Sequence, residues 1–168
     1  MSDQTKKGSV EFAVIFCALV VFIFLPLFGT LAQKALLYQK KEIVHQSANL
    51  ASMAAYTSLN ANQAGIGEQS LLQEEFNNVF QSVLCANLKL DQNLVGFPHS
   101  IATGKVDIIS LTYVSENLPV TVGNRIFMYP FIRCEIKVPV SVDILAGWMN
   151  QDKLLLHEVI YTELPFDK

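Results

Sequence analysis

An uninterrupted apolar run near the N-terminus constrains this chain more than any other feature. Residues 12–33 read FAVIFCALVVFIFLPLFGTLAQ and contain no Lys, Arg, Asp or Glu. About 20 apolar residues in a helix are enough to span the hydrocarbon core of a bilayer, so we predict a transmembrane helix here. Apolar side chains on every face argue against a buried core helix. Pro26 is expected to kink the helix or weaken one turn, which membrane helices tolerate.

A cleaved secretory signal is the competing interpretation of the same run. Such signals have a shorter apolar core, of about 7–15 residues, followed by small residues at the cleavage site. The segment Thr30-Leu31-Ala32 is a weak site of this kind, and cleavage after Ala32 would release a secreted domain. Lysines flank the run on both sides, so the positive-inside rule alone does not orient it. We expect the short N-terminal tail in the cytoplasm and the larger C-terminal part outside, because long segments are exported largely regardless of charge.

The helix is predicted to continue beyond the apolar run. Residues 30–64 lack Pro and Gly and are rich in Ala, Leu, Lys and Gln, which favour helices. Apolar residues recur at the three- and four-residue spacing of an amphipathic helix, at Leu37, Val44, Ala48, Ala51, Ala55 and Leu59. One helix from about Ser9 to Leu59 would be roughly 75 Å long at 1.5 Å per residue. Its small residues would let another backbone approach closely, either that of a neighbouring subunit or that of the chain's own C-terminal domain.

The remaining chain predicts a small α+β domain. Residues 60–67 read as a loop, and residues 68–88 predict a second helix that buries Leu71, Leu72, Phe76, Val79, Phe80 and Val83. β-branched and aromatic residues then dominate the segments 106–114, 124–145 and 154–164. Apolar residues from Ile132 to Val138 alternate with Arg133, Glu135 and Lys137, which is the period of a half-buried strand. We therefore predict three or four antiparallel strands packed on one or two helices, after the long N-terminal helix.

Composition and motifs argue against an enzyme or a nucleic-acid-binding protein. The net charge is −3, and no basic face stands out. The histidines His45, His99 and His157 are scattered, and nothing resembles a nucleophile elbow, a P-loop or a dinucleotide-binding turn. The cysteines lack the spacing of a zinc site. We expect no catalytic residue, no metal, no cofactor and no small-molecule substrate.

The cysteines and one loop supply further candidate residues. Cys17 lies in the apolar run and reads as a small apolar filler. Cys85 and Cys134 either form a disulfide, if their domain lies outside the cytoplasm, or remain two buried thiols. Trp148 and Met149, in the loop 146–150, are candidates for a partner surface unless Trp148 folds back into the core.

The N-terminal segment resembles the prepilins of type IV-like pilus systems. Lys6-Lys7-Gly8 is followed by SVEFAVIF at residues 9–16, then by the apolar helix, its amphipathic continuation and a small β-containing end. This layout is similar to the TadE-like pseudopilins of the tight-adherence (Flp) pilus, which commonly open their membrane helix with a basic residue, a glycine and a VEFAL-like run. The resemblance implies cleavage by a prepilin peptidase after Gly8, with Ser9 as the mature N-terminus.

The acidic residue of the segment also has a counterpart in that family. The resemblance implies that Glu11 pairs with the terminal amine of a neighbouring subunit, and a carboxylate beside hydrocarbon is costly unless it is paired. Glu11 is the third residue after Gly8, whereas the family's usual pattern places the acidic residue fifth.

The function that the resemblance implies is structural. We expect a non-catalytic minor pilin or pseudopilin that helps to assemble a type IV-like (Flp/Tad) pilus for cell adhesion in a bacterial cell envelope. Its partners would be other pilin-like subunits, the prepilin peptidase and the cell membrane. The expected organisation is a cytoplasmic leader (1–8), a transmembrane helix (9–33), its extracytoplasmic continuation (34–60) and an extracytoplasmic α+β domain (61–168). The alternative is a single-pass, membrane-anchored binding domain with no role in a pilus.

Overall fold

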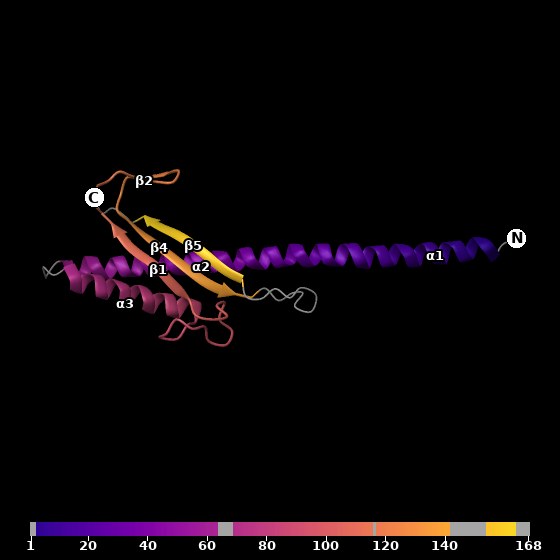
Figure 1. Cartoon of the computed structure of the whole chain (residues 1–168), viewed down its shortest axis with the longest axis horizontal. Helices are drawn as coiled ribbons and strands as arrows, with labels where there is room; N and C mark the ends of the chain where they lie inside the picture. Colours follow the sequence, from indigo (N-terminus) through magenta and orange to yellow (C-terminus); the bar gives the residue numbers. More distant parts are fainter. Residues whose placement is uncertain (1–2, 64–68, 116, 142–153, 164–168) are drawn as a thin grey trace. The chain divides into compact units, whose positions relative to one another are not determined.

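The computed structural model describes residues 3–63, 69–115, 117–141 and 154–163, and the chain divides into two compact units (Figure 1). The first unit holds the helix residues up to Tyr38, and the second begins at Gln39. In chain order the elements are α1 (Asp3–Leu19), the π-helical segment η1 (Val20–Phe24), α2 (Leu25–Gln63), α3 (Gln69–Leu88), β1 (Asp107–Val114), β2 (Val120–Val122), β3 (Arg125–Phe127), β4 (Phe131–Val140) and β5 (Leu154–Glu163). A long apolar helix followed by a small domain with an antiparallel sheet confirms the predicted α+β class.

The predicted long helix is present as three consecutive helical segments, α1, η1 and α2. The π-helical segment η1 ends at Phe24, two residues before Pro26. Pro26 has no backbone N–H to donate to the carbonyl of Phe22, so a regular α-helix would lack one hydrogen bond here. Local changes of helical pitch are one way in which helices adjust to a proline. The turn that we expected Pro26 to disturb is therefore π-helical.

The second unit is built on a three-stranded antiparallel sheet in the order β1-β4-β5. The central strand β4 places Cys134 opposite Leu111 of β1 and opposite Ile160 of β5. In Figure 1 the three strands lie across α3 and the part of α2 that belongs to this unit. The strands β2 and β3 form a separate two-stranded hairpin, which the sequence did not predict. Gly123, between β2 and β3, has a φ of +60°, a conformation that favours glycine.

The alternation predicted in β4 is confirmed by the burial of its side chains. The apolar members of the alternation are fully buried, at Ile132, Cys134, Ile136 and Val138. Arg133, Glu135 and Lys137 lie between them on the opposite face and are partly exposed. One face of the sheet therefore forms the core, and the other carries charges.

The helices of the second unit cover the buried face with apolar stripes. On α2 the predicted small-residue stripe is completely buried, at Val44, Ala48, Ala51 and Ala55. This stripe therefore packs within the chain's own domain, which is one of the two outcomes that its periodicity allowed. On α3 the stripe has a four-residue spacing, at Phe76, Phe80, Leu84 and Leu88. Leu84 and Leu88 were not among the predicted core residues, and Val79 and Val83 are only half-buried.

Polar contacts fix the direction of α2 relative to β5 within this unit. The Lys41 ammonium lies 3.1 Å from the Glu158 carboxylate, and the Thr162 hydroxyl donates to Asn49 Oδ1 over 2.7 Å. The residue numbers therefore increase in the same direction along both elements. The end of the unit that contains Lys41 and the start of β5 is called the proximal end below.

The opposite end of the unit is called the distal end. It contains the end of β1, where Tyr113 contacts Tyr56 of α2 with ring centroids 6.1 Å apart. It also contains the β2–β3 hairpin, because Phe127 of β3 stacks on Phe131 at the start of β4, with centroids 4.2 Å apart. Exposed side chains can therefore be assigned to one end or the other.

The loop 89–106, which joins α3 to β1, lies at the proximal end. Ala102 forms a β-bridge with Val140, and the Thr103 N–H donates to the Pro139 carbonyl over 2.8 Å. Gly96 lies so close to Ala102 that an added Cβ would be 2.1 Å from the Ala102 carbonyl oxygen. No side chain fits at Gly96 unless the backbone moves.

Replacing Gly96 by alanine is expected to lower the free energy of unfolding by about 1–3 kcal/mol, because the added methyl group overlaps a backbone oxygen. Gly104→Ala is the matched control, since its Cβ would lie 3.4 Å from Pro139 Cγ. Urea unfolding of the full chain in detergent, followed by circular dichroism, measures both variants. Equal stability of the two variants would contradict the close approach at Gly96.

Candidate functional site

The first candidate site is the apolar surface of α1, η1 and the start of α2. Among the described residues, one helical stretch, Val10–Thr57, is long and apolar enough to cross a membrane. Large apolar side chains are exposed all along its first half, and Phe12 is 72% exposed. An exposed apolar surface of this extent marks contact with a membrane or a partner. The chain thus carries one transmembrane-like segment and has a surface suited to membrane association.

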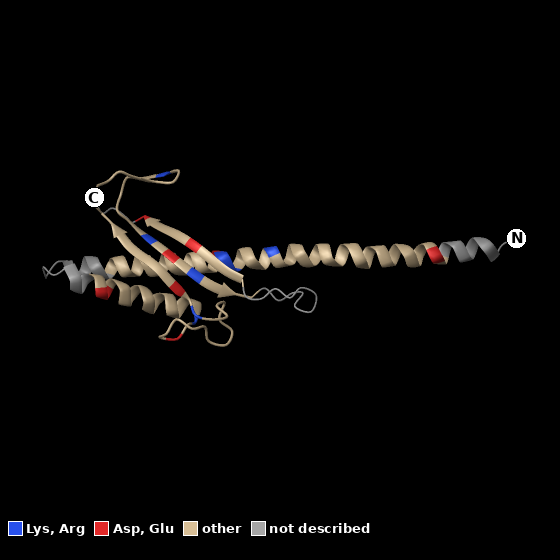
Figure 2. Cartoon of the chain, viewed as in Figure 1, with Lys and Arg blue, Asp and Glu red and all other residues tan. Residues whose placement is uncertain are grey.

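Glu11 lies at the N-terminal border of this surface. Between Lys7 and Lys34 it is the only charged residue of the sequence, and Figure 2 colours this stretch of the helix tan apart from an acidic band near its N-terminal end. Its neighbours one helical turn ahead, Val14 and Ile15, are exposed and apolar. Within the described part of the chain Glu11 forms no ion pair. Its carboxylate is therefore accessible to a partner from outside the chain.

The other residues predicted to have a role in processing or partner contact are Gly8, Ser9, Trp148 and Met149. Gly8 and Ser9 both lie within α1, three and two residues before Glu11. Trp148 and Met149, proposed as a partner surface, lie outside the described residues. The structure describes exposed apolar side chains in several other parts of the second unit, including the β2–β3 hairpin, the loop 89–106, α2, β1 and β5.

The structure does not join Cys85 to Cys134, since both are free thiols. Cys134 is completely buried, and burial together with the nearby Glu135 carboxylate raises its pKa to about 12. Cys85 lies on α3, where its thiol donates to the Asp91 carbonyl over 3.3 Å. Burial and the Asp91 charge also raise the pKa of Cys85. Of the two outcomes that the sequence left open, this structure has two free thiols and no Cys85–Cys134 disulfide, and both thiols stay protonated at neutral pH.

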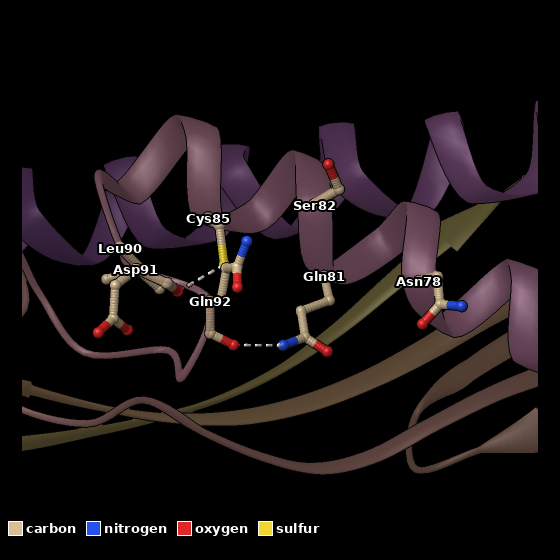
Figure 3. Close-up of a pocket in the computed structure, with 7 residues that line it drawn as sticks. All are labelled: Asn78, Gln81, Ser82, Cys85, Leu90, Asp91 and Gln92. Atoms are coloured by element: carbon tan, nitrogen blue, oxygen red, sulfur yellow. Dashed lines mark hydrogen bonds between the residues drawn. The ribbon is translucent and has the colours of Figure 1, made fainter.

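A shallow hollow surrounds Cys85 at the end of α3 (Figure 3). Polar and apolar atoms contribute about equally to its lining, which consists of Asn78, Gln81, Ser82, Cys85, Leu90, Asp91 and Gln92. The polar groups partly satisfy one another, because the Gln81 side chain donates to the Gln92 carbonyl over 3.2 Å. No histidine lines the hollow to activate the thiol, and a raised pKa makes a thiol a poor nucleophile. This geometry offers no route to thiol catalysis.

A cluster of charged side chains lies on the exposed face of the sheet. Glu135 accepts from Arg133 Nη2 over 2.9 Å, and its other carboxylate oxygen lies 2.9 Å from His157 Nε2. Ser110 lies opposite Glu135, but its hydroxyl has no hydrogen-bond partner and so forms no Ser–His pair. The described residues also contain no group of three or more His, Cys, Asp or Glu side chains able to hold a metal ion. Partly exposed ion pairs of this kind contribute little stability.

Sequence reasoning missed this cluster as a unit. The alternation in β4 placed Arg133 and Glu135 on one face, but His157 lies on another strand, and only the register shows that they meet. The sequence indicated that His157 lies in a strand. It did not indicate which residues of β4 would lie next to the His157 side chain.

Alkylation tests the cysteine environments. In the folded full chain at pH 8, Cys134 is expected to resist iodoacetamide, because with a pKa of about 12 roughly one thiol in ten thousand is ionised. Cys85 is expected to react more slowly than it does in the urea-unfolded chain, since its pKa is raised as well. Peptide mapping by mass spectrometry, with and without prior reduction, reports both reactions. Rapid labelling of folded Cys134, or labelling only after reduction, would contradict this description.

The candidate site is therefore an exposed apolar helix surface bordered by one carboxylate, Glu11, and continued by a folded α+β unit. The described residues hold no cluster of metal-binding side chains beside this surface. Comparisons with protein-family models, with curated proteins and with solved structures found no match to this chain.

Proposed function

We propose that this protein is a minor pilin or pseudopilin that acts in the assembly of a type IV-like pilus. The observation that carries the proposal is the exposed apolar helix with Glu11 at its border. In this proposal the helix sits in the cell membrane, with the N-terminus in the cytoplasm and the α+β unit outside. The same helix docks beside the helices of other pilin-like subunits, and the prepilin peptidase cuts after Gly8.

The role proposed for Glu11 follows from its position. An unpaired carboxylate beside hydrocarbon is penalised, and a nearby ammonium group removes the penalty. The mature N-terminus of a neighbouring subunit, at Ser9 after cleavage, supplies such an ammonium group. Pairing of this kind favours one register of two apolar helices, which otherwise slide past each other with little change in contact.

A second candidate function is a membrane-anchored binding domain with no role in a pilus. The observation that favours it is the apolar tip of the distal end, where Ile126 and Met128 are 62% and 65% exposed. Exposed apolar side chains of this kind suit a protein partner. The apolar helix fits this function and the pilus function equally, so the N-terminus must discriminate between them.

The mature N-terminus distinguishes a pilin from a plain membrane-anchored domain and from a secreted domain. If the protein is a pilin, N-terminal sequencing of the chain purified from its native membrane is expected to begin at Ser9. A chain that retains Met1 or Ser2 indicates a plain anchor, and a chain that begins at Gln33 indicates a secreted domain. Either of these last two results would rule out processing after Gly8.

Replacing Glu11 by glutamine is expected to impair incorporation into filaments without preventing membrane insertion. Loss of one partner from a buried ion pair leaves the other charge uncompensated, at a cost of about 3–5 kcal/mol. Glu42→Gln is the matched control, because Glu42 is an exposed carboxylate on α2 that bonds only to Gln46 in the described structure. Cell fractionation measures insertion, and isolation of sheared filaments measures incorporation. Normal filaments from the Glu11 variant would show that the carboxylate has no pairing role.

A further inference from the structure

Three large hydrophobic side chains gather at the distal end of the second unit, on and beside the β2–β3 hairpin. Ile126, Met128 and Tyr129 are each more than half exposed and lie within four consecutive residues. We call these three residues the distal patch. The other large hydrophobic side chains of this unit that the structure describes as more than half exposed lie one each on α2, in the loop 89–106 and on β5, at Leu50, Phe97 and Leu155. Single exposed side chains are normal on a protein surface, whereas a cluster suggests a contact.

Packing inside the domain holds the distal patch in place. Phe127 stacks on Phe131 of β4, and its ring centroid lies 5.4 Å from that of Tyr161 on β5. These ring contacts fix one face of the hairpin against the sheet. Because side chains alternate along a strand, Ile126 points away from the face that carries Phe127. The hairpin therefore presents hydrophobic side chains on its outer side while its inner side is anchored in the domain.

Two charges of opposite sign accompany the distal patch. Arg125 is exposed on β3, directly before Ile126, and Glu163 is exposed at the end of β5. Glu163 lies opposite Phe131 in the strand register, and therefore on the side of the sheet where the hairpin packs. Figure 2 shows a basic band on the hairpin and an acidic band at the end of β5. Among the described residues, neither Arg125 nor Glu163 takes part in an ion pair.

A surface that carries both charges is complementary to a second copy of itself. In a two-fold symmetric contact, a residue i of one copy meets a residue j of the other copy, and j meets i. Arg125 of each copy then meets Glu163 of the other, so a single rotation forms two ion pairs. A partner of uniform charge would instead place one of these two charges beside a like charge. Met, Tyr and Arg are also enriched in protein interfaces.

We propose that a second copy of this chain docks on the distal patch through a two-fold symmetric contact. Ile126, Met128 and Tyr129 of both copies pack together at its centre, and the Arg125–Glu163 ion pairs form on either side. Three hydrophobic side chains from each copy make a small interface, and interfaces below about 1,200 Å² of total buried area are typically weak and transient. The dimer therefore depends on protein concentration. Since the contact involves the second unit alone, it holds whether or not the chain enters a pilus.

Photo-cross-linking of the full chain in detergent tests the contact. Benzoylphenylalanine replaces Met128, and ultraviolet light joins it to a second copy that lies within contact distance. The same replacement of Leu155 is the matched control, because Leu155 is similarly exposed but lies near the start of β5, at the proximal end. Denaturing gels measure the yield of covalent dimer at several protein concentrations, and circular dichroism shows that each variant is folded. A covalent dimer is expected from position 128 and not from position 155.

Charge reversal then tests the two ion pairs. Arg125→Glu alone and Glu163→Arg alone are each expected to lower the yield of dimer from position 128 about tenfold or more, because both pairs then bring like charges together. The double variant is expected to restore the yield, and so is an equimolar mixture of the two single variants, since opposite charges meet again in both cases. Lys105→Glu, which reverses an exposed charge at the proximal end, should leave the yield unchanged.

The remaining outcomes contradict the proposal. No dimer from position 128, or an equal yield from position 155, shows that the distal patch is not where two copies meet. A dimer that persists in both single charge variants overturns the ion pairs and the symmetric contact built on them. A yield that neither the double variant nor the mixture restores does the same. Association through the apolar helices alone would show no dependence on these charges, so it would overturn the distal contact and leave the proposed pilus role unaffected.

Discussion

The structure depends on one helix that serves two environments. At its start α2 continues an apolar surface that the described part of the chain leaves exposed, and such a surface is stable only against lipid or other apolar helices. Further along, the same helix buries Val44, Ala48, Ala51 and Ala55 in the core of the α+β unit. The element that would anchor the protein is thus also part of the hydrophobic core of its domain. Both stretches belong to α2, which runs from Leu25 to Gln63.

Both edge strands of the sheet carry features that discourage pairing with a further strand. Glu158 points inward from β5, an edge strand, and pairs with Lys41 of α2. An inward-pointing charge discourages a second strand from pairing at the edge. The other edge strand, β1, has a register shift between Ile108 and Ser110, which also disrupts regular pairing. Both features discourage strand pairing between copies of the chain, which fits the proposed assembly through the apolar helices.

The sequence predicted the helices and strands more accurately than it predicted the contacts between them. The second helix was expected at 68–88 and is observed at Gln69–Leu88, and the last strand was expected at 154–164 and is observed at Leu154–Glu163. Both have clear periodicity over ten or more residues. The β2–β3 hairpin was missed because each of its strands has only three residues, too few to show a period. In the candidate site, Glu11 was identifiable from the sequence because a single carboxylate beside an apolar run is conspicuous. The sequence could not decide whether Cys85 and Cys134 form a disulfide, because that depends on which elements lie together. The structure has both as free thiols.

The sequence by itself determined the apolar helix, its amphipathic continuation, the α+β class and the two faces of β4, because each of these follows from periodicity within one segment. The tertiary structure alone decided that Glu135 meets His157, that Lys41 meets Glu158, and that the loop carrying Phe97 lies at the end of the domain where α2 enters. Each of these depends on strand register or helix packing between residues far apart in the chain. A shift of one residue in register turns every side chain of a strand to the other face, and local sequence patterns do not encode that choice.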